Sequence, residues 1–305
     1  RFITRGGRSH LETFARRGFR YLQVDVGGHT DAVRIRRAGC VAERYPFAAC
    51  AGSRDGQGWF ECSDPGFTRL WAYGWKTLQL CAEDVYTDTP WRERSLYGGD
   101  LLVESAATFA ASRDTRLVRR CLELFVQAAD PETGWMGGRA PCAQSHANFA
   151  GFSLLELITT AWYCRLARDR AFARRCQASF QRMMASALDR RGADGLVHVD
   201  KRVFMDHGYP VETGTVCIVN ALLVGALRAW ADLQALLGRN DEARATEVQA
   251  AALETALVNT FWDDAAGAFL DAATSHDADP LHTVYPCAWS LLFCRLNAGI
   301  RTAAV

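Results

Sequence analysis

The sequence has 305 residues, of which 49% are hydrophobic and 23% are charged. These values fit a globular protein of one large domain or two smaller ones, and they exclude an intrinsically disordered chain. The 35 basic residues nearly balance the 34 acidic ones, and the arginines are scattered among acids, so we predict no nucleic-acid partner. No apolar stretch reaches the ~18 residues that a membrane helix needs, so we predict no membrane span.

The 11 cysteines are odd in number and include no C-x-x-C pair. Several of them, including Cys121, Cys164 and Cys217, lie in apolar helical runs, where a free thiol packs as a small hydrophobe. This pattern predicts neither a disulfide framework nor a zinc site, and it favours a reducing, cytoplasmic setting. The chain begins Arg-Phe-Ile-Thr without a signal peptide. We expect a fragment whose true N-terminus lies upstream, which leaves secretion open.

Residues 1–62 differ in pattern from the rest of the chain. Apolar and polar residues alternate over 19–26 before a Gly27-Gly28 turn signal, alternate again over 32–36, and 58–62 reads as one more short strand. Two or three strands form no stable domain alone. We therefore predict that residues 1–62 are the last strands of a preceding β-sandwich domain, and that a second domain covers 63–305.

A helical region begins at Ser63-Asp64-Pro65, where a capping side chain precedes a proline at the first helical position. Apolar periodicity then predicts eight helices, at 66–84, 100–112, 114–129, 150–167, 171–188, 213–237, 241–260 and 283–297. Short connections alternate with long ones at 130–149, 189–212 and 261–282, which carry Gly, Pro, Trp, Asp and His. We therefore predict a mainly α fold, a ring of helical hairpins with one functional face.

The densest chemistry lies in the connection at residues 84–100, which gathers carboxylates, guanidinium groups and aromatic rings. Glycoside hydrolysis needs such a mixture, because one carboxyl must donate a proton while others grip sugar hydroxyls. Asp100 lies near a helix N-terminus, where we expect the helix dipole to keep it ionised. From the residues alone, a salt-bridged surface loop is the competing interpretation.

One motif in this connection resembles the signature of glycoside hydrolase family 78, the α-L-rhamnosidases: Asp88-Thr89-Pro90-Trp91-Arg92-Glu93-Arg94, followed by Gly99-Asp100. The family pattern is Asp-Cys-Pro-Gln-Arg-(Glu/Asp)-Arg-Leu-Gly-Trp-Thr-Gly-Asp, and its three carboxylates fall at the same spacing. Four further segments resemble family segments: residues 18–21, 60–65, and the loop stretches 194–197 and 204–207. The resemblance thus covers nearly the whole chain.

The resemblance implies an (α/α)6-type toroid, incomplete at the C-terminus, and a role for each motif residue. Glu93 corresponds to the general acid, Asp88 and Asp100 to the carboxylates that hold sugar hydroxyls, and Arg92 to the arginine beside them. Tyr97 stands where the family places a Trp against the sugar. Thr89, Trp91, Leu96 and Tyr97 depart from the pattern, so the walls of the pocket differ, and Trp91 or Tyr97 is expected to line it.

Two residues outside the motif are weaker candidates. Trp135, in a long loop, either stacks on a sugar or anchors its loop, and Asp206 is placed by the resemblance near the same cavity, with His207 beside it. His276 and His282 flank Asp277 and Asp279, but their spacing does not establish a ligand set, so we predict no metal. No phosphate-binding loop or nucleophile elbow occurs, and we predict no cofactor.

Inverting hydrolysis also needs a second carboxylate as general base. The resemblance implies that this residue lies beyond Val305, while Glu156 and Glu212 have no positional reason to replace it. The sequence therefore favours an inverting exo-α-L-rhamnosidase acting on rhamnose-containing glycosides. The alternatives are the same toroid acting on another sugar, a catalytically silent carbohydrate-binding fragment, and a helical scaffold for protein partners. Oligomer formation is left open.

Overall fold

The computed structural model describes residues 2–3, 6–28, 33–48, 58–142, 150–199, 204, 206–211, 213–273 and 280–305. Helices dominate it, and all eight predicted helices are confirmed with ends shifted by a few residues. They are α1 Pro65–Cys81, α2 Gly98–Ala111, α3 Arg116–Gln127, α4 Ala150–Ala167, α5 Arg170–Leu188, α6 Cys217–Leu236, α7 Asn240–Phe261 and α8 Val284–Phe293. A short helix that the sequence did not predict, α9 Ala298–Ala303, follows; the Asn297 side chain caps it by accepting from the Ile300 amide.

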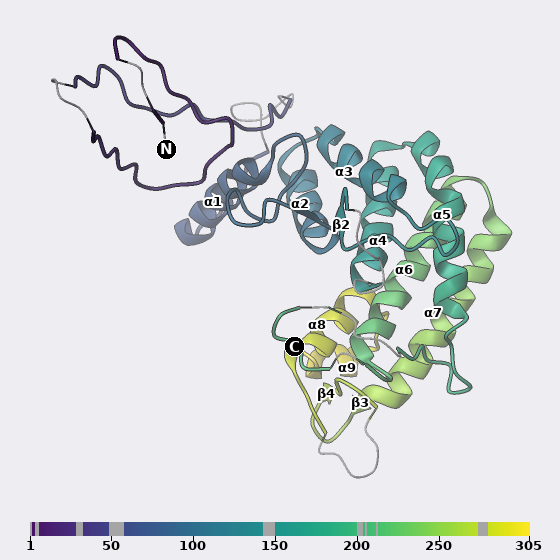
Figure 1. Cartoon of the computed structure of the whole chain (residues 1–305). Helices are drawn as coiled ribbons and strands as arrows, with labels where there is room; N and C mark the ends of the chain where they lie inside the picture. Colours follow the sequence, from purple (N-terminus) through teal and green to yellow (C-terminus); the bar gives the residue numbers. More distant parts are fainter. Residues whose placement is uncertain are drawn as a thin grey trace.

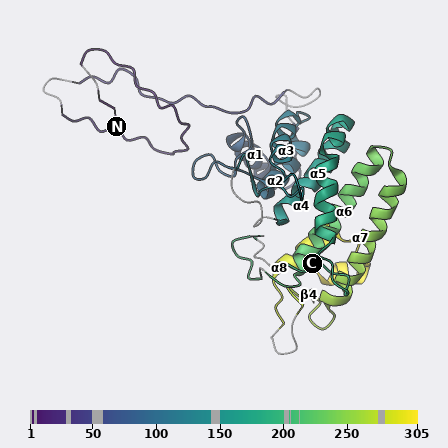
Figure 2. The ribbon, with the colours of Figure 1, turned by 45° about the vertical axis from the view of Figure 1, so that its right-hand side comes forward.

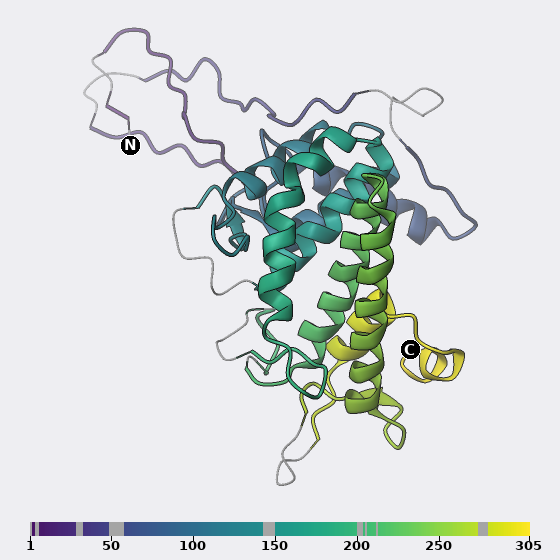
Figure 3. The ribbon, with the colours of Figure 1, turned by 90° about the vertical axis from the view of Figure 1, so that its right-hand side faces the viewer.

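The helices form two layers that follow an arc (Figure 1). Helices α2, α4, α6 and α8 contact one another in succession and form the inner layer, while α3, α5 and α7 each contact the inner helices beside them. Figure 3 shows the long α6–α7 hairpin in green. Buried residues occur on all sides of α4 and α6. Neighbouring helices pack against both faces of each, so neither helix has a side exposed to solvent. Helix α3 buries one stripe only, from Leu117 to Phe125. The predicted ring of hairpins is confirmed, as an open arc.

The long connections lie on one face of this arc, at the N-terminal ends of the inner helices. Residues 82–97, 128–149, 189–216 and 262–283 each lead into the N-terminus of an inner helix, whereas the returns from inner to outer helices are short. The only strands assigned in the described residues belong to these connections. β1 Leu96–Tyr97 pairs antiparallel with β2 Arg139–Ala140, and β3 Trp262–Asp263 pairs with β4 Ala268–Phe269. The β1–β2 pair ties the connection that carries the acidic motif to the one at 128–149, whereas β3 and β4 form a hairpin within the connection at 262–283.

No strand is assigned in the described residues of 1–62, where the sequence predicts strands at 19–26, 32–36 and 58–62. That these residues are the last strands of a preceding β-domain stays a prediction. In its described residues this segment is extended but unpaired, and it projects from the helices (Figures 1 and 2). Alternation shows which face a strand would bury, but without neighbouring strands the backbone has no partners. The segment is anchored after α1, where Arg16 Nη2 donates to the Leu80 carbonyl at 2.9 Å and the Tyr45 amide donates to the Ala82 carbonyl at 2.9 Å. It also contacts the connection between α2 and α3, where the Ala48 amide donates to Asp114 Oδ2 at 2.8 Å. The predicted domain boundary at residue 62 stays a prediction.

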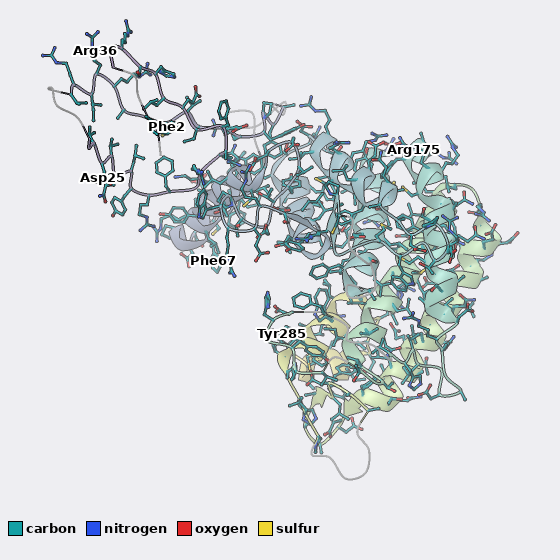
Figure 4. All side chains as sticks on the ribbon, in the orientation of Figure 1. Phe2, Asp25, Arg36, Phe67, Arg175 and Tyr285 are labelled. Atoms are coloured by element: carbon teal, nitrogen blue, oxygen red, sulfur yellow. The ribbon has the colours of Figure 1, made fainter. Side chains whose placement is uncertain are left out.

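One face of α1 presents large apolar side chains to solvent. Phe67, Leu70 and Tyr73 are 59%, 62% and 65% exposed, and they recur every three residues, so they lie along one side of the helix. Phe67 marks this end of the arc, with Tyr285 near the other end (Figure 4). Burying one such side chain stabilises a contact by about 1.5–3 kcal/mol. A face of this kind favours association.

We therefore expect the chain to self-associate as its concentration rises. Replacing Phe67 and Tyr73 together with Ser should raise the monomer fraction in sedimentation velocity without lowering the melting temperature, because neither side chain is buried. Val248→Ser is the matched control, since Val248 is 70% exposed on α7 away from this face. A chain that stays monomeric at every concentration would contradict the expectation.

Candidate active site

The acidic motif closes into a compact loop between α1 and α2. The Asp88 amide donates to the Ser95 carbonyl at 3.1 Å, and the Ser95 amide donates back to Asp88 Oδ1 at 2.8 Å. These two bonds bring Asp88 and Ser95 opposite each other and leave the residues between them as the tip of the loop. Glu93 lies in this tip and is exposed. The loop therefore has a hydrogen-bonded carboxylate, Asp88, at its base and an exposed carboxylate, Glu93, at its tip.

Arg94 is a structural residue of this loop. Its backbone has φ of +48°, in the left-handed region that non-glycine residues rarely adopt. Its guanidinium donates to Glu83 Oε2 at 2.6 Å, and Glu83 also pairs with Arg16. Glu83 is thus shared by two arginines, and it links the motif loop to the N-terminal segment. The positive charge of Arg94 is directed to Glu83, not to the motif acids.

Asp100 lies in the first turn of α2, close to the other acids of the motif. Burial raises the pKa of Asp100 above its ordinary value, and the charges of Asp88 and Glu93 raise it further, against a backbone hydrogen bond that lowers it. The net direction of the shift is thus opposite to the effect expected from the helix N-terminus, which by itself favours the ionised form of Asp100. A dipole effect of about 0.3–1 kcal/mol near a helix end is outweighed by burial and two like charges.

Tyr97 connects the loop tip to the start of α2. It lies in β1, directly across from Arg139 of β2. The pKa of Tyr97 is raised first by burial and then by hydrogen bonding and charge from the Glu93 carboxylate, while Arg139 lowers it. Glu93 therefore lies beside the Tyr97 hydroxyl. The influence of Asp88 and Glu93 on Asp100, and of Glu93 on Tyr97, indicates that these side chains lie near one another. That they point into one cavity stays a prediction.

The other two motif residues face the N-terminal segment or solvent. The guanidinium of Arg17 lies 4.9 Å from the centre of the Trp91 ring, in cation–π geometry, and a Cβ on Gly18 would lie 3.0 Å from Trp91 Cβ. Trp91 is still 48% exposed. Arg92 is exposed and has no hydrogen-bond or ion-pair partner within the described residues. One face of Trp91 is therefore occupied by Arg17, while Arg92 is available to a ligand.

Trp135 has the contacts of a loop anchor. Its indole N–H donates to Ser186 Oγ on α5 at 3.0 Å, and its carbonyl accepts from the Asp130 amide at 2.8 Å. Gly134 beside it has φ of +77°, and a Cβ there would lie 2.2 Å from the Ser179 carbonyl oxygen. The loop is therefore pressed against α5. A role for Trp135 in stacking on a sugar stays a prediction.

Asp206 lies in a loop that reaches toward the start of α2. Its Oδ2 accepts from the Tyr285 hydroxyl of α8 at 2.9 Å, and its Oδ1 accepts from the His207 amide at 2.7 Å. Phe204, two residues earlier, packs edge-on against Phe152 of α4 at 5.9 Å between ring centres. Phe152 in turn lies against Gly99. This chain of contacts joins the Asp206 loop to the end of the arc that carries Asp100.

Two carboxyls near the motif have an environment that the sequence did not reveal. Glu104 lies one helical turn after Asp100 on α2; burial, with the charges of Asp100 and Asp88, raises the pKa of Glu104 to about 9. Glu156 is fully buried in α4, and burial raises its pKa well above the ordinary value. Glu104 follows Asp100 by four residues, and this spacing could have predicted that both lie on the same face of α2. The raised pKa keeps Glu104 protonated at neutral pH, and burial favours the neutral form of Glu156.

A separate hollow lies between the far ends of α4 and α6. It is lined by Ala161, Arg165, Asp232, Leu233 and Leu236. Arg165 follows Glu156 by nine residues on α4, about 14 Å along the helix. This hollow is therefore distinct from the acidic cluster.

The described residues contain no group of three side chains arranged to hold a metal ion, and none of their helices is long and apolar enough to cross a membrane.

Comparison with known sequences identifies the family. Residues 55–291 match the bacterial α-L-rhamnosidase six-hairpin glycosidase domain. The chain belongs to this family. No match was found among curated proteins.

Solved structures share the fold of this rhamnosidase-family domain. The family 78 rhamnosidase of Bacillus sp. GL1 is 24% identical, with a TM-score of 0.73 over 85% of this chain and 27% of that one. The Klebsiella oxytoca rhamnosidase, which has rhamnose bound, is 23% identical, with a TM-score of 0.70 over 80% of this chain and 47% of that one. The Streptomyces avermitilis α-L-rhamnosidase, complexed with L-rhamnose, is 19% identical, with a TM-score of 0.63 over 80% and 22%. The chain thus spans less than half of each of these relatives.

The buried Glu156 of this rhamnosidase-family domain should make stability fall as pH rises. In the unfolded chain Glu156 loses its proton near the ordinary value of 4.5, whereas its raised pKa keeps it protonated in the fold. Above about pH 4.5 the native state therefore binds the extra proton, and the free energy of unfolding falls by roughly 1.4 kcal/mol per pH unit until the folded pKa is reached. Glu156→Gln removes this loss.

Thermal melts of the parent and of Glu156→Gln at a series of pH values should therefore differ more as pH increases above 4.5. Glu132→Gln, at an exposed position, is the control and should track the parent at every pH. A difference between parent and Glu156→Gln that does not change with pH would mean that Glu156 ionises in the folded protein.

Proposed function

We propose that this chain forms the larger part of the catalytic domain of an inverting exo-α-L-rhamnosidase. The observation that carries the proposal is the shared environment of the three motif acids, in which burial and then the charges of Asp88 and Glu93 raise the pKa of Asp100. The surface-loop alternative predicts acids paired with the arginines of their own motif. Instead Arg94 pairs with Glu83, which leaves the three acids close to one another on the face of the arc that carries the long connections.

Glu93 is proposed as the proton donor to the glycosidic oxygen. It lies at the exposed tip of the loop, where a substrate can reach it, and beside the Tyr97 hydroxyl. Asp88 and Asp100 are proposed to hold sugar hydroxyls. Asp88 Oδ1 is occupied by the Ser95 amide, whereas its Oδ2 has no partner within the described residues and can accept from a hydroxyl. Charged acceptors of this kind strengthen their hydrogen bonds as charge develops on the sugar ring.

The general base is proposed to be a carboxylate outside residues 1–305. Glu104 does not suit the role, because a carboxyl with a pKa of about 9 keeps its proton at neutral pH and cannot take one from water. Glu156 does not suit it either, because it is fully buried. The coverage of 27% and 47% of two rhamnosidases supports this part of the proposal, because most of their length lies outside the matched region.

We also propose a cytoplasmic setting, since thiols such as Cys121 and Cys176 are buried and free, and free thiols are typical of a reducing compartment.

The assignment of Glu93 predicts a dependence on the leaving group in a full-length protein that contains this chain. Glu93→Gln should lower the rate by ~10²–10⁴-fold on a substrate with a poor leaving group. On an activated aryl rhamnoside, which departs without protonation, the loss should be far smaller. Asp88→Asn should reduce both rates alike, because it removes a hydroxyl contact and no proton. Equal losses for Glu93→Gln on both substrates would assign it to binding.

The proposed substrate can be tested on the chain itself by calorimetric titration with L-rhamnose. Asp88→Asn should weaken binding about 10- to 100-fold, because a hydrogen bond to a charged group contributes about 1.5–3 kcal/mol. Asp241→Asn, on the exposed start of α7, should change nothing. Binding of a different sugar in preference to L-rhamnose would favour the second candidate, the same domain with another substrate. Two contacts at the wall of the site favour that candidate. Arg17 covers one face of Trp91, and Tyr97 lies beside Glu93.

A further inference from the structure

Glu156 is a buried carboxyl that the proposed reaction does not use. It lies on the inner helix α4 between Leu155 and Leu157, and its exposure is 0%. Neither of its carboxyl oxygens has a hydrogen-bond partner among the described residues. Leaving a polar group buried and unpaired costs about 1–3 kcal/mol. A leucine in its place would avoid this cost. The contacts of the Glu156 carboxyl with neighbouring residues are therefore the place to look for its role.

Its neighbour is the first residue of α2. A Cβ built on Gly98 would lie 2.3 Å from Glu156 Oε1 and 3.0 Å from its Cγ and Cδ. The backbone of Gly98 does not have the positive φ that demands glycine, so glycine is required there for space alone. The Gly98 amide also donates to the Gly138 carbonyl at 3.0 Å. The start of α2 is thus held between α4 on one side and the connection at 128–149 on the other.

A second contact of the same kind lies one helical turn away. Phe152 precedes Glu156 by four residues on α4, so both project from one face. A Cβ on Gly99 would lie 2.8 Å from the Phe152 ring. Two successive residues of α4's inner face therefore pack against two successive glycines. Tyr97 precedes this glycine pair and Asp100 follows it, so any shift of the pair moves both residues of the site.

We propose that Glu156 is a positioning residue of the sugar site, fixing the turn Tyr97–Asp100 through its contact with Gly98. The proposal rests on the proposed function of that site. A flat carboxyl lets the glycine backbone approach closely, and close packing transmits a change of even one methylene to the neighbouring backbone. Glu156 touches no substrate and acts only through Gly98.

A double-mutant cycle tests the contact without any need for activity. Gly98→Ala introduces a methyl into the space of the carboxyl, and Glu156→Ala removes that carboxyl. Hydrogen exchange at the Leu102 amide, which bonds to the Gly98 carbonyl in an α-helix, reports the turn. Gly98→Ala alone should speed this exchange about tenfold, and the double variant should recover most of that change. Gly74→Ala is the control, since a Cβ on Gly74 meets nothing within 4 Å. Additive effects in the cycle would overturn the contact.

Titration with L-rhamnose then tests positioning against a merely structural role. Glu156→Ala should weaken binding about tenfold, measured well below its melting temperature, while the shape-conserving Glu156→Gln should bind as the parent does. Ile158→Val, a packing loss on the same helix, should lower the melting temperature and leave the affinity unchanged. A Glu156→Ala variant of lowered stability but parental affinity would refute positioning. If the parent binds no L-rhamnose, the proposed function fails, whereas the exchange cycle still decides whether Glu156 fixes the turn.

Discussion

Helices α4 and α6 have no polar side, and the architecture follows from the need to cover them. Buried residues occupy the whole circumference of α6, from Cys217 to Gln234, and such a helix is stable only with neighbours on every face. Helices α4, α7 and α8 supply them. Alternation of inner and outer helices then sends every long connection to the N-terminal end of an inner helix. The acidic motif is one of these connections, so its position results from the packing of helices that carry no chemistry.

The electrostatics of the site depend on where the arginines are directed. Arg94 and Arg16 both bind Glu83, and Arg92 extends into solvent. The acids of the motif are therefore left near one another, and burial and like charge raise the pKa of Asp100 and of Glu104. Of the two, Glu104 has a pKa of about 9 and keeps its proton at neutral pH, so it can donate a hydrogen bond. The loop geometry creates this environment because the Asp88–Ser95 bonds close it tightly.

Local signals in the sequence predicted the helices well, but they did not predict how deeply individual side chains such as Glu156 are buried. Asp64 and Pro65 mark the start of α1, and Asp64 does cap it. The spacing of Asp88, Glu93 and Asp100 predicted their proximity. The strands expected at 19–26 did not form, since alternation cannot supply a partner strand. The ionisation of Asp100 and the burial of Glu156 depend on tertiary neighbours such as Gly98, which no local pattern contains.

The central claim is that the motif acids form one sugar-binding site on this rhamnosidase-family domain. A crystal of the chain soaked in L-rhamnose tests it most directly. The account predicts density for one sugar ring whose hydroxyls lie within hydrogen-bond distance of Asp88 and Asp100, with Glu93 and Tyr97 at its edge. Density in the hollow lined by Arg165 and Asp232, with none beside the motif acids, would contradict it.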